Sequence, residues 1–320
     1  MTDWIELIKE AKTVAIFSHI NSDGDANGSA LAIKYMLDDL GKETYVFVPT
    51  PINKSYHFLG VNEISCTRKL SSYDLAIAVD APNTKRFGQC ENEFFKAKKS
   101  INIDHHADNE NYATINIVEP DISSACELIY KLFKAENINI TPKIATCIYL
   151  GISTDTGGFM RGFHGAVTTE TWFAIADLVK LGADTKLVNE NIFMTMRKSV
   201  FELYRKGLDK VEFFEDGKIA MLCITKKILD ETGTELTDTH KITDVINGIE
   251  GVEITAIMTQ KGYREQSVSV RAHNKNAQRI CKYFGGGGHL KASGCRIYKQ
   301  FYDAKAELLE QCKKELYRND

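Results

Sequence analysis

The sequence lacks the features that mark secreted, membrane and fibrous proteins. No apolar run reaches the length needed to cross a bilayer, and residues 1–10 form a charged amphipathic segment unlike a signal peptide. The eight cysteines contain no C-x-x-C motif and mostly lie in apolar stretches, so we expect reduced core thiols. Repeats and low-complexity tracts are also absent. We therefore expect a cytoplasmic globular protein with no membrane partner.

A strong excess of charge of one sign is also lacking, because the formal net charge is −3. The two parts of the chain nevertheless differ. Residues 1–185 carry 17 basic and 24 acidic side chains, and residues 186–320 carry 23 and 19. An acidic half suits metal ions and a basic half suits phosphates, although a solvated surface gives the same count. The small basic excess argues against a processive exonuclease that acts on long chains.

Short apolar runs alternate with helical patterns in the first part of the chain. This alternation predicts an α/β fold with a doubly wound, mostly parallel sheet. Residues 186–210 contain no Pro and no Gly before Gly207, which predicts one long helix leading into a second, smaller α/β domain. The expected organisation is a first domain at residues 1–185, a linker helix at 186–209 and a second domain at 210–320.

Acidic and histidine side chains follow several of the predicted strands. His19, Asp23 and Asp25 follow the apolar run 13–17, Asp80 ends a buried run, and Asp104 follows the next one. The carboxyl ends of parallel strands lie along one edge of a sheet, so these groups can converge. Close carboxylates repel one another unless a cation lies between them. Carboxylates with imidazole suit Mn²⁺, Fe²⁺, Zn²⁺ or Mg²⁺, so we favour a metal site over a solvated Asp-Gly turn.

The last third of the chain contains candidates for phosphate or base binding. Four glycines at 285–288 precede His289, and Arg271 lies on a neighbouring predicted strand. This combination favours phosphate or base contact over a flexible turn. Arg86 follows Asp80 in sequence, and both a phosphate contact and a surface salt bridge remain open for it.

The order of the acidic and histidine motifs along the chain resembles that of the DHH phosphoesterase family, which is named for the site Asp104-His105-His106. The run Gly285–His289, followed by Ala292-Ser293-Gly294, is similar to the glycine-rich motif of the family's C-terminal domain. The resemblance covers nearly the whole chain, and the two-domain length resembles the nanoRNase and phosphoadenosine-phosphate phosphatase branch. Ser22 stands where the family often has Pro, which removes no ligand. His164 falls where small polar residues are usual, and we assign it no role.

The resemblance implies a site for two divalent ions, usually Mn²⁺. By position, His19 and Asp23 would hold one ion, and Asp80 would bridge to the second. The ligands of the second ion would be Asp25, His105 and Asp155.

The resemblance also implies roles beyond the metal ligands. His106 would be catalytic, as an acid or a phosphate-binding group, together with the bridging Asp80. Asp104 would orient one of the metal-binding residues without binding the metal itself. The substrate-binding residues would be Arg86, Arg271, Gly286, Gly287, Gly288, His289 and Ser293.

The implied reaction is in-line attack of hydroxide on phosphorus. The expected substrates are short oligoribonucleotides, cleaved to 5′-mononucleotides, and 3′-phosphoadenosine 5′-phosphate, cleaved to AMP. Alternative reactions with the same chemistry are the hydrolysis of pApA and of cyclic dinucleotides. Pyrophosphate is disfavoured as a substrate because the glycine run suits a nucleotide. A rival of another class is a non-catalytic nucleotide-binding module, which predicts that metal ligands are lost, and none is missing. The preferred substrate, the metal, the direction of degradation and a homodimeric state stay open.

Overall fold

The structure is a computed structural model that describes residues 4–49, 51–60, 69–159, 167–288 and 290–318. The chain divides into two compact units, Met1–Thr195 and Met196–Asp320. None of the described helices has the length and apolar composition needed to span a membrane. The seven described cysteines are free thiols and six of them are buried, as expected from the sequence.

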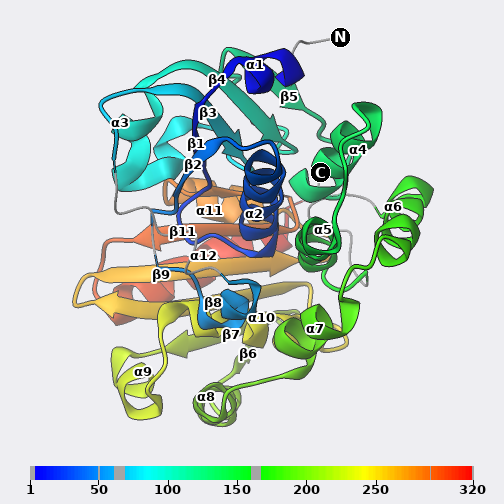
Figure 1. The fold of residues 1–320 in the computed structure, drawn as a ribbon. Coiled ribbons are helices and arrows are strands. Elements are labelled where there is room, and N and C mark those ends of the chain that lie inside the picture. The colour runs from blue at the N-terminus through cyan, green and yellow to red at the C-terminus, as the bar shows by residue number, and fades with distance from the viewer. Residues whose placement is uncertain (1–3, 50, 61–68, 160–166, 289, 319–320) are drawn as a thin grey trace. The chain divides into compact units, whose positions relative to one another are not determined.

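Five parallel strands form the sheet of the first unit, in the order β2-β1-β3-β4-β5 (Figure 1). The strand order reverses between β1 and β3. In doubly wound sheets, ligands bind at such a switch point, outside the carboxyl ends of the strands. The predicted parallel α/β sheet is confirmed. Its strands are β1 (Thr13–Phe17), β2 (Glu43–Phe47), β3 (Tyr73–Val79), β4 (Ala97–Asp104) and β5 (Ile115–Val118).

Apolar side chains are buried on both faces of this sheet. One face carries an aliphatic core that includes Ile16 and Ile77, and the other carries an aromatic cluster around Phe17 and Phe87. The α-helices of the unit are α1 (Trp4–Glu10), α2 (Gly24–Asp39), α3 (Glu91–Phe94), α4 (Ala125–Ala135), α5 (Pro142–Asp155), α6 (Thr169–Lys180) and α7 (Thr185–Asn189). The unit also contains the 3₁₀-helical segments η1 (Lys54–Leu59) and η3 (Thr84–Cys90) and the π-helical segment η4 (Glu190–Met194).

Close packing of α2 against α5 brings two ligand-bearing segments together (Figure 1). Gly28 permits this approach, because a Cβ there would lie 2.4 Å from the carbonyl oxygen of Cys147. Gly151 does the same on α5, where a Cβ would lie 2.5 Å from Oδ1 of Asp25. A side chain at either position would push the helices apart.

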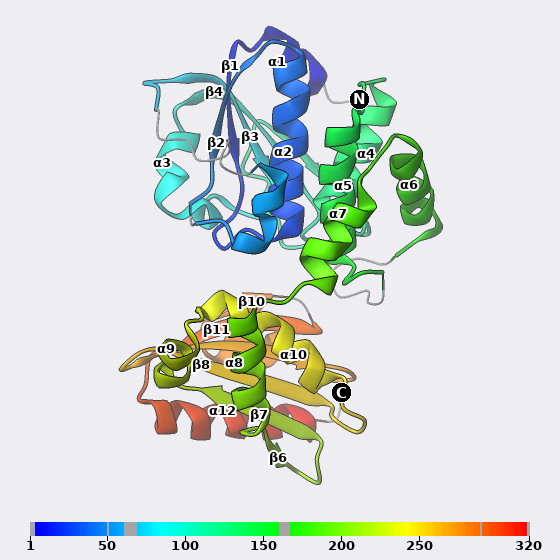
Figure 2. The same cartoon turned by 60° about the horizontal axis from the view of Figure 1, so that its bottom comes forward.

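The single long helix predicted for residues 186–209 is not formed, so that prediction was wrong (Figure 2). Helix α7 passes into the π-helical turn η4, and Thr195 then has an extended backbone with φ −105° and ψ 132° before α8 (Lys198–Leu208) begins. Ile192 packs in the core of the first unit and Val200 in a core of the second. The two ends of this segment therefore pack in different hydrophobic cores, which interrupts the helix. Neither Gly nor Pro marks the interruption in the sequence.

The described residues of the second unit form a mixed sheet of six strands, in the order β10-β11-β9-β8-β7-β6. Strands β7 and β8 pair in parallel, and the other described pairs are antiparallel. Helices α8 and α10 pack on one face and α12 on the other (Figure 2). The smaller α/β domain is thus confirmed. Its remaining elements are β6 (Glu212–Phe214), β7 (Ile219–Ile224), α9 (Lys226–Thr232), η5 (Leu236–Thr239), α10 (His240–Asn247), β8 (Ile254–Gly262), β9 (Glu265–Ala272), α11 (Ala277–Tyr283), β10 (Gly287–Gly288), β11 (Ala292–Ile297) and α12 (Phe301–Leu316).

Candidate metal centre

Three strand ends of the first sheet converge on the carboxylate of Asp80. Its Oδ2 lies 3.3 Å from Nε2 of His19, which follows β1, and its Oδ1 lies 3.6 Å from Nε2 of His105, which follows β4. Asp80 itself has φ 52°, a left-handed conformation that is uncommon for a residue other than glycine. Backbone strain of this kind persists where the surrounding structure over-determines it, which is typical of functional sites.

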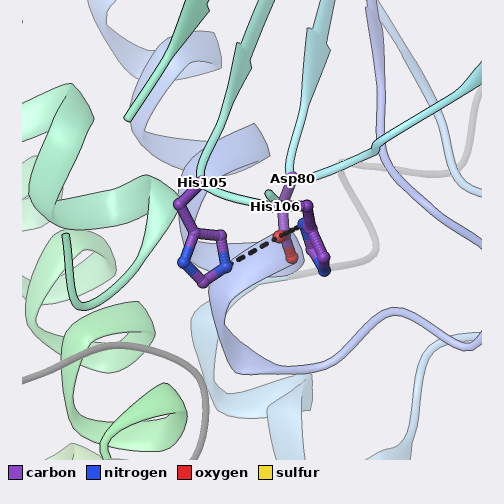
Figure 3. A group of neighbouring side chains, drawn as sticks. All are labelled: Asp80, His105 and His106. Carbon is purple, nitrogen blue, oxygen red and sulfur yellow. Dashed lines mark ion pairs between the residues drawn. The ribbon is translucent and has the colours of Figure 1, made fainter. Parts of the chain in front are cut away.

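Among the described residues, the side chains at and around Asp80 form three groups, each with potential ligand atoms within 4.8 Å of one another. One group faces β1, one lies at the end of α5, and the third includes the neighbouring histidines after β4 (Figure 3). Asp80 belongs to two of the three. The groups are His19, Asp23 and Asp80; Asp25, His105 and Asp155; and Asp80, His105 and His106.

Helix termini hold the outer carboxylates. Asp23 is the N-cap of α2, and its Oδ1 accepts the backbone N–H groups of Asp25 and Ala26 at 3.1 Å. Asp25 in turn accepts the N–H groups of Ala125 at 2.7 Å and of Cys126 at 2.9 Å, at the start of α4. A helix N-terminus stabilises negative charge in this way.

Asp155 stands at the opposite kind of position, because it is the last residue of α5. The negative end of the helix dipole disfavours a carboxylate there. Its Oδ2 lies 3.3 Å from Nε2 of His105. A cation at this point would offset the unfavourable charge.

Burial and mutual repulsion perturb the titration of these groups. Burial raises the pKa of Asp25 to about 7, with a further contribution from the charge of Asp80. Burial also raises the pKa of Asp155 well above its ordinary value, and the charge of Asp25 adds to the effect. For His19, burial lowers the pKa, but hydrogen bonds to Asp23 and Asp80 outweigh it and raise the pKa to about 10. Without a cation, protons must occupy this centre.

The residues present fit a divalent metal ion. Oδ1 of Asp80 and Oδ2 of Asp155 are buried and have no hydrogen-bond partner in the described part of the chain. Nδ1 of His19 lies 2.8 Å from the carbonyl oxygen of Ile20, which can only accept, so Nδ1 carries a hydrogen. Nε2, which faces the carboxylates, is then the nitrogen that would bind a metal ion after losing its proton. Carboxylates with imidazole are a donor set for divalent transition metals.

His106 makes its closest ion-pair contact with Asp104, which belongs to none of the three groups. Its Nδ1 lies 2.8 Å from Oδ1 of Asp104. The same nitrogen lies 3.6 Å from Oδ1 of Asp80 (Figure 3). The sequence predicts that Asp104 orients a neighbouring ligand, and its contact here is with His106. Burial lowers the pKa of His106, whereas the hydrogen bond to Asp104 raises it more, so the pKa is raised overall.

Sequence reasoning did not single out Tyr56 or Asn102. Burial raises the pKa of the Tyr56 hydroxyl, and the negative charges of Asp23 and Asp155 raise it further. An aromatic residue in an irregular stretch of sequence gives no sign that it will interact with these charged groups. Asn102 does carry one, because it is a polar residue inside the apolar run of β4 and is fully buried there.

Most of the predicted substrate-binding residues come together in the second unit. Arg271 on β9 pairs with Ala292 on β11, and Gly287 and Gly288 pair with Gly294 and Ser293. Gly286 also belongs here, since a Cβ on it would lie 2.3 Å from the carbonyl oxygen of Gly294.

The other predicted residues lie elsewhere. Arg86 is in η3 of the first unit, where its carbonyl accepts the N–H of Ile20 at 2.8 Å. His289 and His164 lie outside the described residues.

Comparison with known proteins agrees with this fold. Residues 13–152 match the DHH family, N-terminal domain. A Thermus thermophilus protein named bifunctional oligoribonuclease and PAP phosphatase NrnA is 30% identical over 310 residues, which are 95% of this chain and 90% of that protein. The cyclic-di-AMP phosphodiesterase PdeA of Listeria monocytogenes is 26% identical over 323 residues, which cover 94% of this chain and 47% of that protein. The crystal structure of an exopolyphosphatase-related protein from Bacteroides fragilis matches with a TM-score of 0.88 and 25% identity, covering 98% of this chain and 95% of that one.

The fold, the acidic and histidine centre and these matches define a hydrolase that acts on phosphoester bonds. The chain belongs to the DHH family.

Proposed function

We propose that this protein is a manganese-dependent phosphoesterase that hydrolyses short oligoribonucleotides to 5′-mononucleotides and 3′-phosphoadenosine 5′-phosphate to AMP. The proposal for the substrates is supported by similarity to the Thermus thermophilus oligoribonuclease and PAP phosphatase over nearly the full length of both chains. The proposal for two ions is supported by one observation above others. The two oxygens of Asp80 face different histidines, each of which belongs to a separate group of potential ligands.

In this proposal His19, Asp23 and Asp80 hold one ion, and the other is held by Asp80 with Asp25, His105 and Asp155. When bound, divalent ions polarise phosphoryl oxygens and lower the pKa of a bound water. The remaining tasks belong to the chain. Asp25 is fixed by the first N–H groups of α4, and His106, which would act as an acid or a phosphate-binding group, is held at Nδ1 by Asp104.

A second candidate function is hydrolysis of pApA or a cyclic dinucleotide. It is favoured by the similarity to the Listeria monocytogenes phosphodiesterase, although this chain spans about half of that protein's length. Both candidates use the same centre, so the groups around Asp80 do not rank them.

A product analysis on matched substrates tests the proposal. We expect hydrolysis of a diribonucleotide and of 3′-phosphoadenosine 5′-phosphate with Mn²⁺ to exceed that of cyclic di-AMP and of a 20-nucleotide RNA by roughly tenfold or more in kcat/KM. Chromatography of the products against AMP and inorganic phosphate standards identifies the bond that is cut. Faster cleavage of cyclic di-AMP would transfer the proposal to the second candidate, and equal cleavage of the long RNA would contradict both.

Arg271 provides a test of substrate recognition away from the scissile bond. We expect Arg271→Ala to lower kcat/KM for dinucleotides and 3′-phosphoadenosine 5′-phosphate by roughly 10–1,000-fold, or about 1.4–4 kcal/mol, because a guanidinium forms charge-assisted bonds to phosphate. Cleavage of bis-p-nitrophenyl phosphate, which has no nucleotide, should be nearly unchanged. Arg296→Ala on β11, whose side chain pairs with Glu265, serves as the matched control. Equal losses on both kinds of substrate would assign Arg271 to the catalytic centre instead.

A further inference from the structure

A continuous chain of hydrogen bonds runs from the turn after Asp80 to the ring of His106. The carbonyl oxygen of Ala81 accepts the hydroxyl of Tyr112 at 2.9 Å and Nδ2 of Asn102 at 3.3 Å. Nδ2 of Asn102 also donates to the Tyr112 oxygen at 2.9 Å. Nδ2 of Asn109 then donates to Oδ1 of Asn102 at 2.7 Å and to Oδ2 of Asp104 at 2.5 Å.

Backbone groups at both ends set the direction of this chain. The carbonyl of Ala81 can only accept, so Asn102 must turn Nδ2 toward it and Oδ1 toward Asn109. The N–H of Asn111 can only donate, and it lies 2.7 Å from Oδ1 of Asn109. The two hydrogens of the Asn109 amide are therefore both used, one on Asn102 and one on Asp104.

The same direction extends to the imidazole. Asp104 accepts from Asn109 on Oδ2 and faces Nδ1 of His106 with Oδ1 at 2.8 Å. A carboxylate has no hydrogen to donate, so Nδ1 of His106 carries one whether the ring is neutral or charged. Asn109 also holds the loop itself, because its N–H donates to the carbonyl of His106 at 3.2 Å.

We propose that Asn109 is a positioning residue that acts through Asp104 to fix the orientation and the hydrogen-bonding form of His106 in the phosphoester hydrolysis proposed above. It does not contact any member of the predicted metal-ligand set in the hydrogen bonds of the described residues. The network also ties this loop to the turn after Asp80, since Glu110 N–H donates to the carbonyl of Pro82 at 2.9 Å. Residues that support a ligand or catalytic group in this way typically contribute about 10–100-fold to activity.

A double-mutant cycle separates this role from a merely structural one. Asn109→Asp keeps the shape of the side chain but replaces both donors by an acceptor that faces Asp104 and Asn102. We expect it to lower kcat on 3′-phosphoadenosine 5′-phosphate by roughly 10–100-fold with KM changed less than about threefold and bound manganese unchanged. In a His106→Ala background the same substitution should cost less than about twofold, because the group it positions is gone.

The exposed neighbour Glu110 supplies the matched control, and Glu110→Gln should retain wild-type kcat. If Asn109→Asp does not fold, Tyr112→Phe completes a second cycle, because its ring packing against Phe87 and Phe94 is kept while the hydroxyl is lost. Its loss should be roughly 3–10-fold and should also vanish with His106→Ala. Additive losses in the cycle, or loss of bound manganese, would overturn the positioning role. Wild-type protein that is inactive on every substrate would instead contradict the proposed function.

Discussion

Asp80→Asn should reduce kcat by roughly 1,000-fold or more while the protein still folds. A loss of about 4 kcal/mol of transition-state stabilisation corresponds to this factor and is the scale expected for a charge that serves two ions. Asparagine has the size of aspartate and tolerates the left-handed backbone that residue 80 adopts, so the substitution removes the charge without adding strain. Alanine tolerates this backbone conformation less well, so Asp80→Ala would combine the loss of charge with added backbone strain.

The measurement is kcat on 3′-phosphoadenosine 5′-phosphate at saturating Mn²⁺, together with the number of bound ions per chain. Asp216→Asn is the matched control, because Asp216 is also an aspartate with φ 54° and lies in an exposed turn of the second unit. It should leave kcat unchanged. More than about a tenth of wild-type activity in Asp80→Asn, with both ions bound, would exclude the bridging role.

Removing divalent metal with excess EDTA should abolish hydrolysis, and Mn²⁺ should restore it better than Mg²⁺. The reason is the predicted donor set of four carboxylates, Asp80 included, and the imidazoles of His19 and His105, which has more nitrogen than a site built for Mg²⁺. Activity is measured after dialysis against EDTA and again after each metal is added back. Full activity in EDTA would contradict any metal-dependent mechanism at this centre.

The pKa values also predict how metal and pH act together on stability. In the metal-free protein the pKa of Asp25 is raised to about 7, so the folded state holds this proton more tightly than the unfolded state does. The resulting stability is present at low pH and is lost as pH rises from about 4, the ordinary value, through about 7. The raised pKa of His19 acts in the same direction, with its contribution present below about 6.5 and lost towards about 10.

The melting temperature of the metal-free protein should therefore fall between pH 5 and pH 8. Metal replaces these protons, so the rise in melting temperature on adding Mn²⁺ should be larger at pH 8 than at pH 5. Asp80 does not alter this sign, because its pKa is held well below its ordinary value and it stays charged throughout the range. A rise that is independent of pH would show that the centre does not exchange protons for metal.

Local patterns in the sequence determined the strands, the ends of several helices and the set of acidic and histidine side chains. Apolar runs predicted β1, β3 and β4 because a strand buried on both faces needs continuous apolar residues. Ser124, Thr141 and Thr168 are residue types preferred at helix starts, and each accepts a backbone N–H at the start of a helix in the structure. Parallel strand ends share an edge, so even the meeting of Asp80 with His19 followed from order alone.

Only the tertiary structure decided how those side chains are held. Asp25 is fixed by N–H groups about a hundred residues later in the chain, at α4, and Asn109 links Asp104 to Asn102 across a loop. The break between α7 and α8 likewise arises because Ile192 and Val200 pack in two different hydrophobic cores. Sequence periodicity reports which side of one element is apolar. It carries no record of which distant donor, acceptor or core that element meets, because those contacts exist only once the chain is packed.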